Sequence, residues 1–260
     1  MAALDEKTLR NVLDFAVDAA RAAGALTLEY FQKGTHVELK PDRTPVTAAD
    51  RGAEELLRER IERAFPTHGI VGEEHGVKSG SEPARWILDP IDGTFSFISG
   101  VPLYAVLIGF EWEGEAVAGV VHMPALSEML SAARGLGCTW NGQKARVSEV
   151  SSLSDARLVY ASAKWPAQNG RGAEFSRLLD ACGKDRGWCD AYGYALVATG
   201  RAEIALDPVM ALWDTAALLP VVTEAGGTLT DWNGVPTHKA PEALATNGRL
   251  LEPTLRALRG

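Results

Sequence analysis

The stretch WILDPIDGTFSFISG, residues Trp86 to Gly100, constrains the fold most strongly. Its apolar start predicts a buried strand that ends on Asp89, and a second carboxylate, Asp92, follows directly after Pro90 and Ile91. Two like charges about 4 Å apart repel by roughly 4 kcal/mol at an effective dielectric near 20, which is a large part of a domain's stability. Because Mg²⁺ prefers carboxylate and carbonyl oxygens, we expect both carboxylates and the Ile91 carbonyl to bind a metal ion.

The two residues after this pair suit a bound anion. Gly93 lets the backbone approach a ligand closely, and the following amides could open a helix whose N-terminus attracts anions. The hydroxyl of Thr94 could hydrogen-bond a water or a phosphate oxygen. Metal ions beside such amides are typical of phosphoryl-transfer chemistry.

Composition limits the other function classes. The chain has 260 residues and a formal net charge of -8, which argues against a general nucleic-acid binder. Its three cysteines show no zinc spacing and no disulfide framework. The first residues lack the apolar core of a secretory signal, and no run of 18 apolar residues predicts a membrane span. We therefore expect a cytoplasmic protein with no membrane or nucleic-acid partner.

The pattern along the chain predicts mixed α and antiparallel β structure over about 1–150, then alternating α/β structure over about 151–260. A long amphipathic helix is expected over about 5–33. A second helix starts at Thr47, with Asp50 as its capping-box partner. One hairpin turns near Glu113 and Gly114, and another turns at Asn141 and Gly142. The two parts should form one catalytic domain, 1–260, with two lobes that share a cleft.

Further carboxylates follow expected strands or open expected helices. Glu73 and Glu74 end a short strand, Asp50 opens the second helix, and Asp214 opens a later helix in LWDTAA. Each has a simpler explanation: Asp50 as a capping residue, Asp214 as a complement to the helix dipole, and the glutamates as a solvated turn. Local sequence leaves both interpretations of these residues open.

Three segments, GEE, WILDPIDGT and WDTAALLPVVTEAGG, stand in the order and at the spacing of a known signature. With them the chain resembles the inositol monophosphatase family of Mg²⁺-dependent, lithium-sensitive phosphatases over essentially its whole length. The resemblance implies the layered αβαβα sugar-phosphatase fold of the inositol monophosphatase and fructose-1,6-bisphosphatase type, usually as a homodimer. It also implies two or three Mg²⁺ ions per active site.

Matched by motif position, the resemblance assigns the metal ligands. Glu73, Asp89 and the carbonyl of Ile91 would hold the first metal, and Asp89, Asp92 and Asp214 the second. The role of Glu74 is not assigned in this way.

The resemblance assigns the other site residues similarly. Asp50 would lie near a weaker third metal. Thr94, together with Glu73, would orient the attacking water, and the amides of Gly93 and Thr94 would bind the phosphate. The implied reaction is direct attack of a metal-activated water on a small phosphomonoester.

The wall of the cleft, which selects the alcohol, is most similar to the histidinol-phosphate phosphatase branch of this family. The tracts SFISG, CDAYGYALVATGRAEIALDP and EAGGTLTDWNG carry that similarity. Asp190 and Asp207 are carboxylates beyond the metal set, and they would suit the ammonium and imidazole of histidinol phosphate. Asp190 could instead cap the following helix, and Asp207 could be a turn residue before Pro208.

Two other functions stay open at this stage. An inositol-1-monophosphatase or a broad-specificity phosphatase would use Asp207 but leave Asp190 without a substrate partner. A non-catalytic binding partner with the same fold is the alternative from a different functional class. The complete acidic set and the lack of basic patches argue against it as the sole role.

Overall fold

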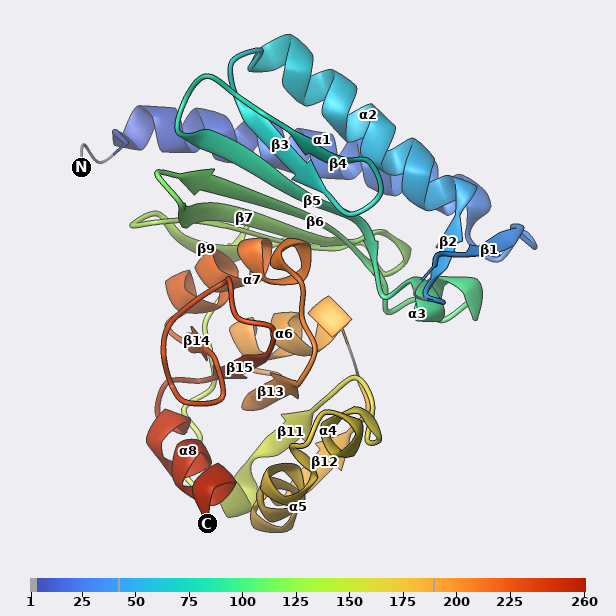
Figure 1. Cartoon of the computed structure of the whole chain (residues 1–260). Coiled ribbons are helices and arrows are strands. Elements are labelled where there is room, and N and C mark those ends of the chain that lie inside the picture. Colours follow the sequence, from blue (N-terminus) through green and yellow to red (C-terminus); the bar gives the residue numbers. More distant parts are fainter. Residues whose placement is uncertain (1–3, 42, 189) are drawn as a thin grey trace.

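The computed structural model describes residues 4–41, 43–188 and 190–260, and they form five layers (Figure 1). Helices α1 and α2 cover a large sheet, α6 and α7 lie between it and a small sheet, and α5 and α8 cover the far side. The expected αβαβα architecture is thus confirmed. The helices are α1 (Glu6–Tyr30), α2 (Ala48–Ala64), α3 (Thr94–Ile98), α4 (Trp165–Gln168), α5 (Gly172–Ala181), α6 (Asp190–Ala198), α7 (Leu212–Glu224) and α8 (Leu251–Arg259).

The large sheet has eight strands in the order β10-β9-β8-β7-β6-β5-β3-β4. Among the described strands of this sheet, β3 and β5 run parallel and the other neighbours run antiparallel. Its strands are β3 (Gly69–Gly72), β4 (Gly76–Lys78), β5 (Ala84–Asp92), β6 (Ala105–Trp112), β7 (Glu115–Met123), β8 (Glu128–Ala133), β9 (Gly137–Trp140) and β10 (Gln143–Lys144). A separate two-stranded ribbon, β1 (Val37–Leu39) and β2 (Pro45–Thr47), leads into α2.

The small sheet has five strands in the order β12-β11-β13-β15-β14. Strand β11 runs parallel to both β12 and β13, so the carboxyl ends of these three strands meet at one edge. Its strands are β11 (Arg157–Val159), β12 (Lys184–Arg186), β13 (Ile204–Asp207), β14 (Thr228–Thr230) and β15 (Ala243–Thr246).

Local sequence explains where several elements begin and turn. In α2 the Thr47 hydroxyl accepts the Ala49 amide at 3.1 Å, and Asp50 Oδ2 accepts the Thr47 amide at 2.8 Å. This is the expected capping box. Asn141 and Gly142 have φ values of 48° and 78°, as a two-residue hairpin turn requires.

Apolar side chains fill the spaces between the layers. One buried cluster joins α1 and α2 to the large sheet, a second joins that sheet to α6 and α7, and a third lies between the small sheet and α5 with α8. Trp86 and Trp232 are buried in this interior. Among the described residues no helix has the length and apolar character needed to cross a bilayer.

Some elements were not predicted from the sequence. Strand β12 reads KDR and is largely exposed, so it has no alternating apolar pattern to reveal it. Helix α8 and strand β15 also went unpredicted. Cys138 and Cys182 are free thiols, whereas Cys189 lies outside the described residues.

Candidate active site

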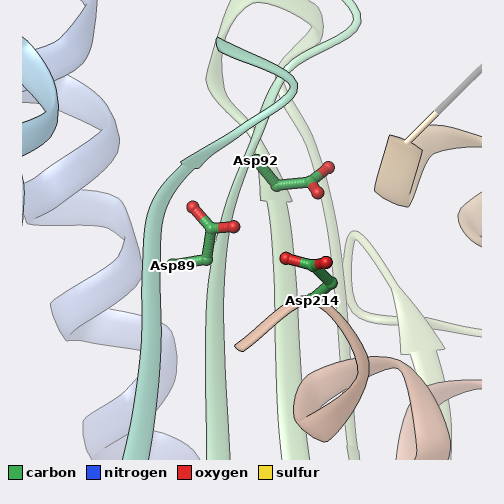
Figure 2. Close-up of side chains that lie close together, drawn as sticks. All are labelled: Asp89, Asp92 and Asp214. Carbon is green, nitrogen blue, oxygen red and sulfur yellow. The ribbon is translucent and has the colours of Figure 1, made fainter. Parts of the chain in front are cut away.

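The site begins with an irregularity in β5. Side chains three residues apart on a regular strand point to opposite faces, so Asp89 and Asp92 would ordinarily be separated. The pairing of β5 with β6 shifts between these two residues, which is a bulge or similar irregularity. Bulges redirect side chains, and here both carboxylates are turned toward the same space (Figure 2).

Helix α7 adds the third carboxylate from far along the chain. Asp214 lies in its first turn, and its Oδ2 accepts the Ala211 amide at 2.7 Å, which fixes the side chain at the helix start. Figure 2 shows the Asp214 side chain turned toward Asp89 and Asp92. One oxygen from each of the three lies within 4.8 Å of the others, a spacing at which they could hold a metal ion.

Burial and mutual repulsion make this cluster costly when it is ionised. Burial, together with the charges of Glu73, Asp92 and Asp214, raises the pKa of Asp89 well above its usual value. Burial and the charges of Asp190 and Asp214 do the same to the pKa of Asp92. Burial, then Glu73 and Asp190, raises the pKa of Asp214 to about 7 despite its bond from the Ala211 amide. A bound cation would relieve this repulsion.

The parallel pairing of β3 with β5 brings Glu73 beside Asp89. Gly72 pairs with Leu88, and the Glu73 amide continues the ladder by donating to the Leu88 carbonyl at 3.2 Å. The Glu73 carboxylate is not one of the three that share the 4.8 Å spacing, although its charge acts on Asp89 and Asp214. The carboxyl ends of β3 and β5 therefore lie side by side.

Lys40 is a site residue that the sequence did not reveal. Its Nζ lies 2.6 Å from both Glu73 Oε1 and Glu74 Oε1. Burial opposes its charge, but the hydrogen bonds to both glutamates raise its pKa above the usual value. The lysine lies between β1 and β2, where neither periodicity nor a motif points toward the carboxylates. Glu74 is therefore part of a partly buried ion pair rather than of a solvated turn.

Gly93 and Thr94 form the turn between the cluster and α3. Gly93 has a φ of 79°, which favours glycine, and Thr94 begins the short helix, as expected. The Thr94 hydroxyl lies 3.0 Å from the Ile91 carbonyl oxygen and 3.3 Å from Asp50 Oδ1. Asp50 therefore caps α2 with one oxygen, as one interpretation of the sequence expected, and contacts Thr94 with the other.

Asp190, at the start of α6, lies close to the Gly93 turn, and its charge acts on Asp92. A Cβ placed on Gly93 would lie 2.9 Å from Asp190 Oδ2, so this carboxylate closely approaches the Gly93 turn. The amide of Ala191, the next residue, donates to Asp92 Oδ2 at 2.7 Å. These contacts connect the start of α6 with the end of β5. A side chain turned away from the site, the simpler alternative for Asp190, does not agree with this geometry.

Asp207 lies deeper, at the carboxyl end of β13, and is 3 % exposed. Its Oδ1 accepts the Ala161 amide at 2.9 Å, and its Oδ2 accepts the Tyr194 hydroxyl at 3.2 Å. Burial, with a contribution from the charges of Asp190 and Asp214, raises its pKa to about 8. It is therefore electrostatically connected to the cluster, but both of its oxygens already have protein partners.

Known proteins resemble this chain along most of its length. The sequence model described as the inositol monophosphatase family matches residues 8–259. A histidinol-phosphatase of Chlorobaculum parvum is 45% identical over 223 residues, covering 85% of this chain and 86% of that protein. A histidinol-phosphatase of Streptomyces coelicolor is 39% identical over 262 residues, covering 97% and 96%.

A solved structure shares the arrangement of layers. An inositol monophosphatase from Zymomonas mobilis superposes with a TM-score of 0.86 at 30% sequence identity, covering 96% of this chain and 98% of that one. The fold is therefore common to proteins whose names specify different phosphate esters, so the fold alone does not select the substrate.

Proposed function

Because the chain belongs to the inositol monophosphatase family, we propose that it is a metal-dependent phosphomonoesterase that hydrolyses histidinol phosphate to histidinol and phosphate. The observation that carries the proposal is the convergence of Asp89, Asp92 and Asp214 beside the Gly93–Thr94 turn. Carboxylates and amide donors in one place match the two needs of this reaction, which are cations and a site for the phosphate. Histidine biosynthesis is the setting that this substrate implies.

The donor chemistry fits Mg²⁺. All three clustered side chains offer hard carboxylate oxygens, and burial, followed by the charges of neighbouring carboxylates, raises the pKa of each of them. Asp89, Asp92 and Asp214 would hold one ion, and Glu73, Asp89 and the Ile91 carbonyl another, with Asp50 near a third. When bound, the ions supply a lowered pKa for an attacking water and charge neutralisation for the leaving oxygen.

The protein's own residues position the reactants. The Thr94 hydroxyl donates its hydrogen toward the Ile91 carbonyl and Asp50 Oδ1. The lone pairs of the hydroxyl oxygen would then accept a hydrogen bond from a water. The amides of Gly93 and Thr94 open α3 and would donate to the phosphate oxygens. Glu73 would share with Thr94 the task of orienting the water.

Recognition of the alcohol would fall to the residues on the α6 side of the site. Asp190 approaches the Gly93 turn, so a substrate whose phosphate is bound there would present its alcohol portion near this carboxylate. Histidinol carries an ammonium and an imidazole, and charge-assisted hydrogen bonds to Asp190 would favour it over a neutral polyol. Asp207, whose pKa is raised to about 8, would lie farther from the phosphate than Asp190 and take part in recognition of the same alcohol portion.

A substrate panel tests this function. Metal-free protein is supplied with Mg²⁺, and phosphate release is compared for histidinol phosphate and inositol 1-phosphate. We expect a clear preference for histidinol phosphate and no release with EDTA. Equal rates, or a reversed order, would defeat the substrate assignment and leave a phosphatase of broader specificity.

The second candidate is an inositol-1-monophosphatase, which the Zymomonas mobilis structure favours. An inositol-1-monophosphatase would have the same metal site, so metal dependence does not distinguish the two candidates. The substrate panel does, because their preferred substrates differ. That the enzyme is cytoplasmic and works as a homodimer stays a prediction. Light scattering of the purified protein tests the oligomeric state.

A further inference from the structure

Three polar side chains lie on the side of α2 that is turned toward the site. Asp50, Glu54 and Arg58 follow one another at intervals of one helical turn. Asp50 contacts Thr94, as described above. The other two contact the turn between β3 and β4, which carries Glu73 and Glu74. The mechanism proposed above gives Glu54 and Arg58 no function.

Glu54 is fully buried, and its carboxylate accepts three hydrogen bonds. Oε2 accepts the amide of Glu74 at 2.7 Å, while Oε1 accepts the amide of His75 at 3.1 Å and Arg58 Nε at 2.7 Å. Arg58 also donates through Nη2 to the Gly76 carbonyl. The carboxylate and the guanidinium therefore hold successive backbone groups of the turn that follows Glu73.

Gly72, directly before Glu73, leaves the space that this carboxylate occupies. A Cβ built on Gly72 would lie 2.0 Å from Glu54 Oε1 and 2.4 Å from its Cδ. Real atoms do not approach so closely, so an alanine there would displace either the glutamate or the strand end. The position of the Glu54 carboxylate therefore requires a glycine at position 72.

We propose that Glu54 is a positioning residue that holds the turn after Glu73 in place and so keeps the Glu73 carboxylate near Asp89, and that the protein's affinity for its divalent cation depends on it. The inference rests on the proposed function, since it assigns Glu73 to the metal site. Glu73 has one backbone anchor on the strand side, its amide to the Leu88 carbonyl at 3.2 Å. Glu54 supplies the anchor on the other side, through the next two amides.

The test measures metal binding apart from turnover, by Mn²⁺ titration of metal-free protein followed by electron paramagnetic resonance. Glu54→Gln keeps the size of the side chain, but its NH₂ group cannot accept an amide hydrogen, so at least one anchor is lost. We expect the Mn²⁺ dissociation constant to rise about tenfold, as for other residues that orient metal ligands. Excess Mg²⁺ should then restore most of the phosphatase rate.

Two further variants complete the experiment. Glu55→Gln, an exposed change on the same helix, should bind Mn²⁺ as the wild type does. Gly72→Ala should weaken Mn²⁺ binding, as Glu54→Gln does. If Glu54→Gln does not fold, Gly72→Ala alone provides the test. A folded variant at either position with an Mn²⁺ dissociation constant within twofold of wild type overturns the inference, even if its melting temperature falls. Failure of the wild type to bind Mn²⁺ would instead overturn the proposed function, and this inference with it.

Discussion

Replacing Asp214 with asparagine should stabilise the metal-free protein while abolishing its activity. The raised pKa of Asp214, about 7 against an ordinary 3.8, means that the folded protein holds this proton more tightly than the unfolded chain does. Stability therefore falls as the pH rises from about 4 to about 7, and the full penalty is present above that range. Asparagine carries no charge, so the variant avoids the penalty.

The size of the effect follows from the pKa difference. A difference of about 3 units corresponds to about 4 kcal/mol of unfolding free energy at 1.36 kcal/mol per unit. Weakening of the bond between the Ala211 amide and the side chain offsets about 1 kcal/mol of this gain. The net gain of about 3 kcal/mol should raise the melting temperature by roughly 6 °C in a protein of this size.

Thermal unfolding at pH 8.5 in EDTA, with and without excess Mg²⁺, measures this prediction. Mg²⁺ at 100 times its dissociation constant should stabilise the wild type by about 2.7 kcal/mol. The variant has lost one carboxylate and should gain less, so the difference in melting temperature should shrink with Mg²⁺ and also as the pH falls toward 4. Asp180→Asn, at an exposed position, is the matched control.

Two outcomes would refute the reasoning. The first is an Asp214→Asn protein that melts below the wild type in EDTA at pH 8.5, because the carboxylate would then be a net stabilising group. The second is a gain that Mg²⁺ leaves unchanged, because the repulsion would then have no connection with metal binding.

Other changes test separate parts of the account. Asp190→Ala should raise KM for histidinol phosphate by about tenfold or more, as loss of a charge-assisted bond does, while KM for inositol 1-phosphate changes little; equal losses would assign Asp190 to structure. Thr94→Ala should lower kcat by about a hundredfold with a smaller change in KM, and a normal kcat would remove its hydroxyl from the mechanism. Glu111 is 1% exposed, and its two carboxylate oxygens lie 2.7 Å from Arg85 Nε and 2.6 Å from His238 Nε2. Glu111→Gln should therefore lower the unfolding free energy, measured by denaturant titration, by about 3 kcal/mol. A loss below 1 kcal/mol would show that this buried pair is not coupled to folding.

Much of the site could be predicted because its chemistry is local in sequence. Asp89 and Asp92 are close together along the chain, and their mutual repulsion already indicates a cation. Glu73 and Asp214 required the family resemblance, since nothing in sequence spacing shows that two distant segments meet. The fold followed similarly: long helices and glycine-containing turns were predictable, whereas the short charged strand β12 was not.

What the sequence did not reveal consists of tertiary contacts made by common residues. Lys40 contacts Glu73 and Glu74 only because the ribbon before α2 folds over the strand ends. Glu54 looks like one of many glutamates on an amphipathic helix until its burial and its three donors are seen. The contacts of Lys40 and of Glu54 are made with residues distant in sequence, and the periodicity of the sequence does not reveal such contacts.

We propose that Asp89, Asp92 and Asp214 share one divalent cation. Anomalous diffraction from crystals soaked in Mn²⁺ tests it most directly. The account predicts a strong anomalous peak among these three carboxylates, lost in crystals of Asp214→Asn. Well-ordered crystals of an Mn²⁺-activated enzyme with no peak at that position would contradict it.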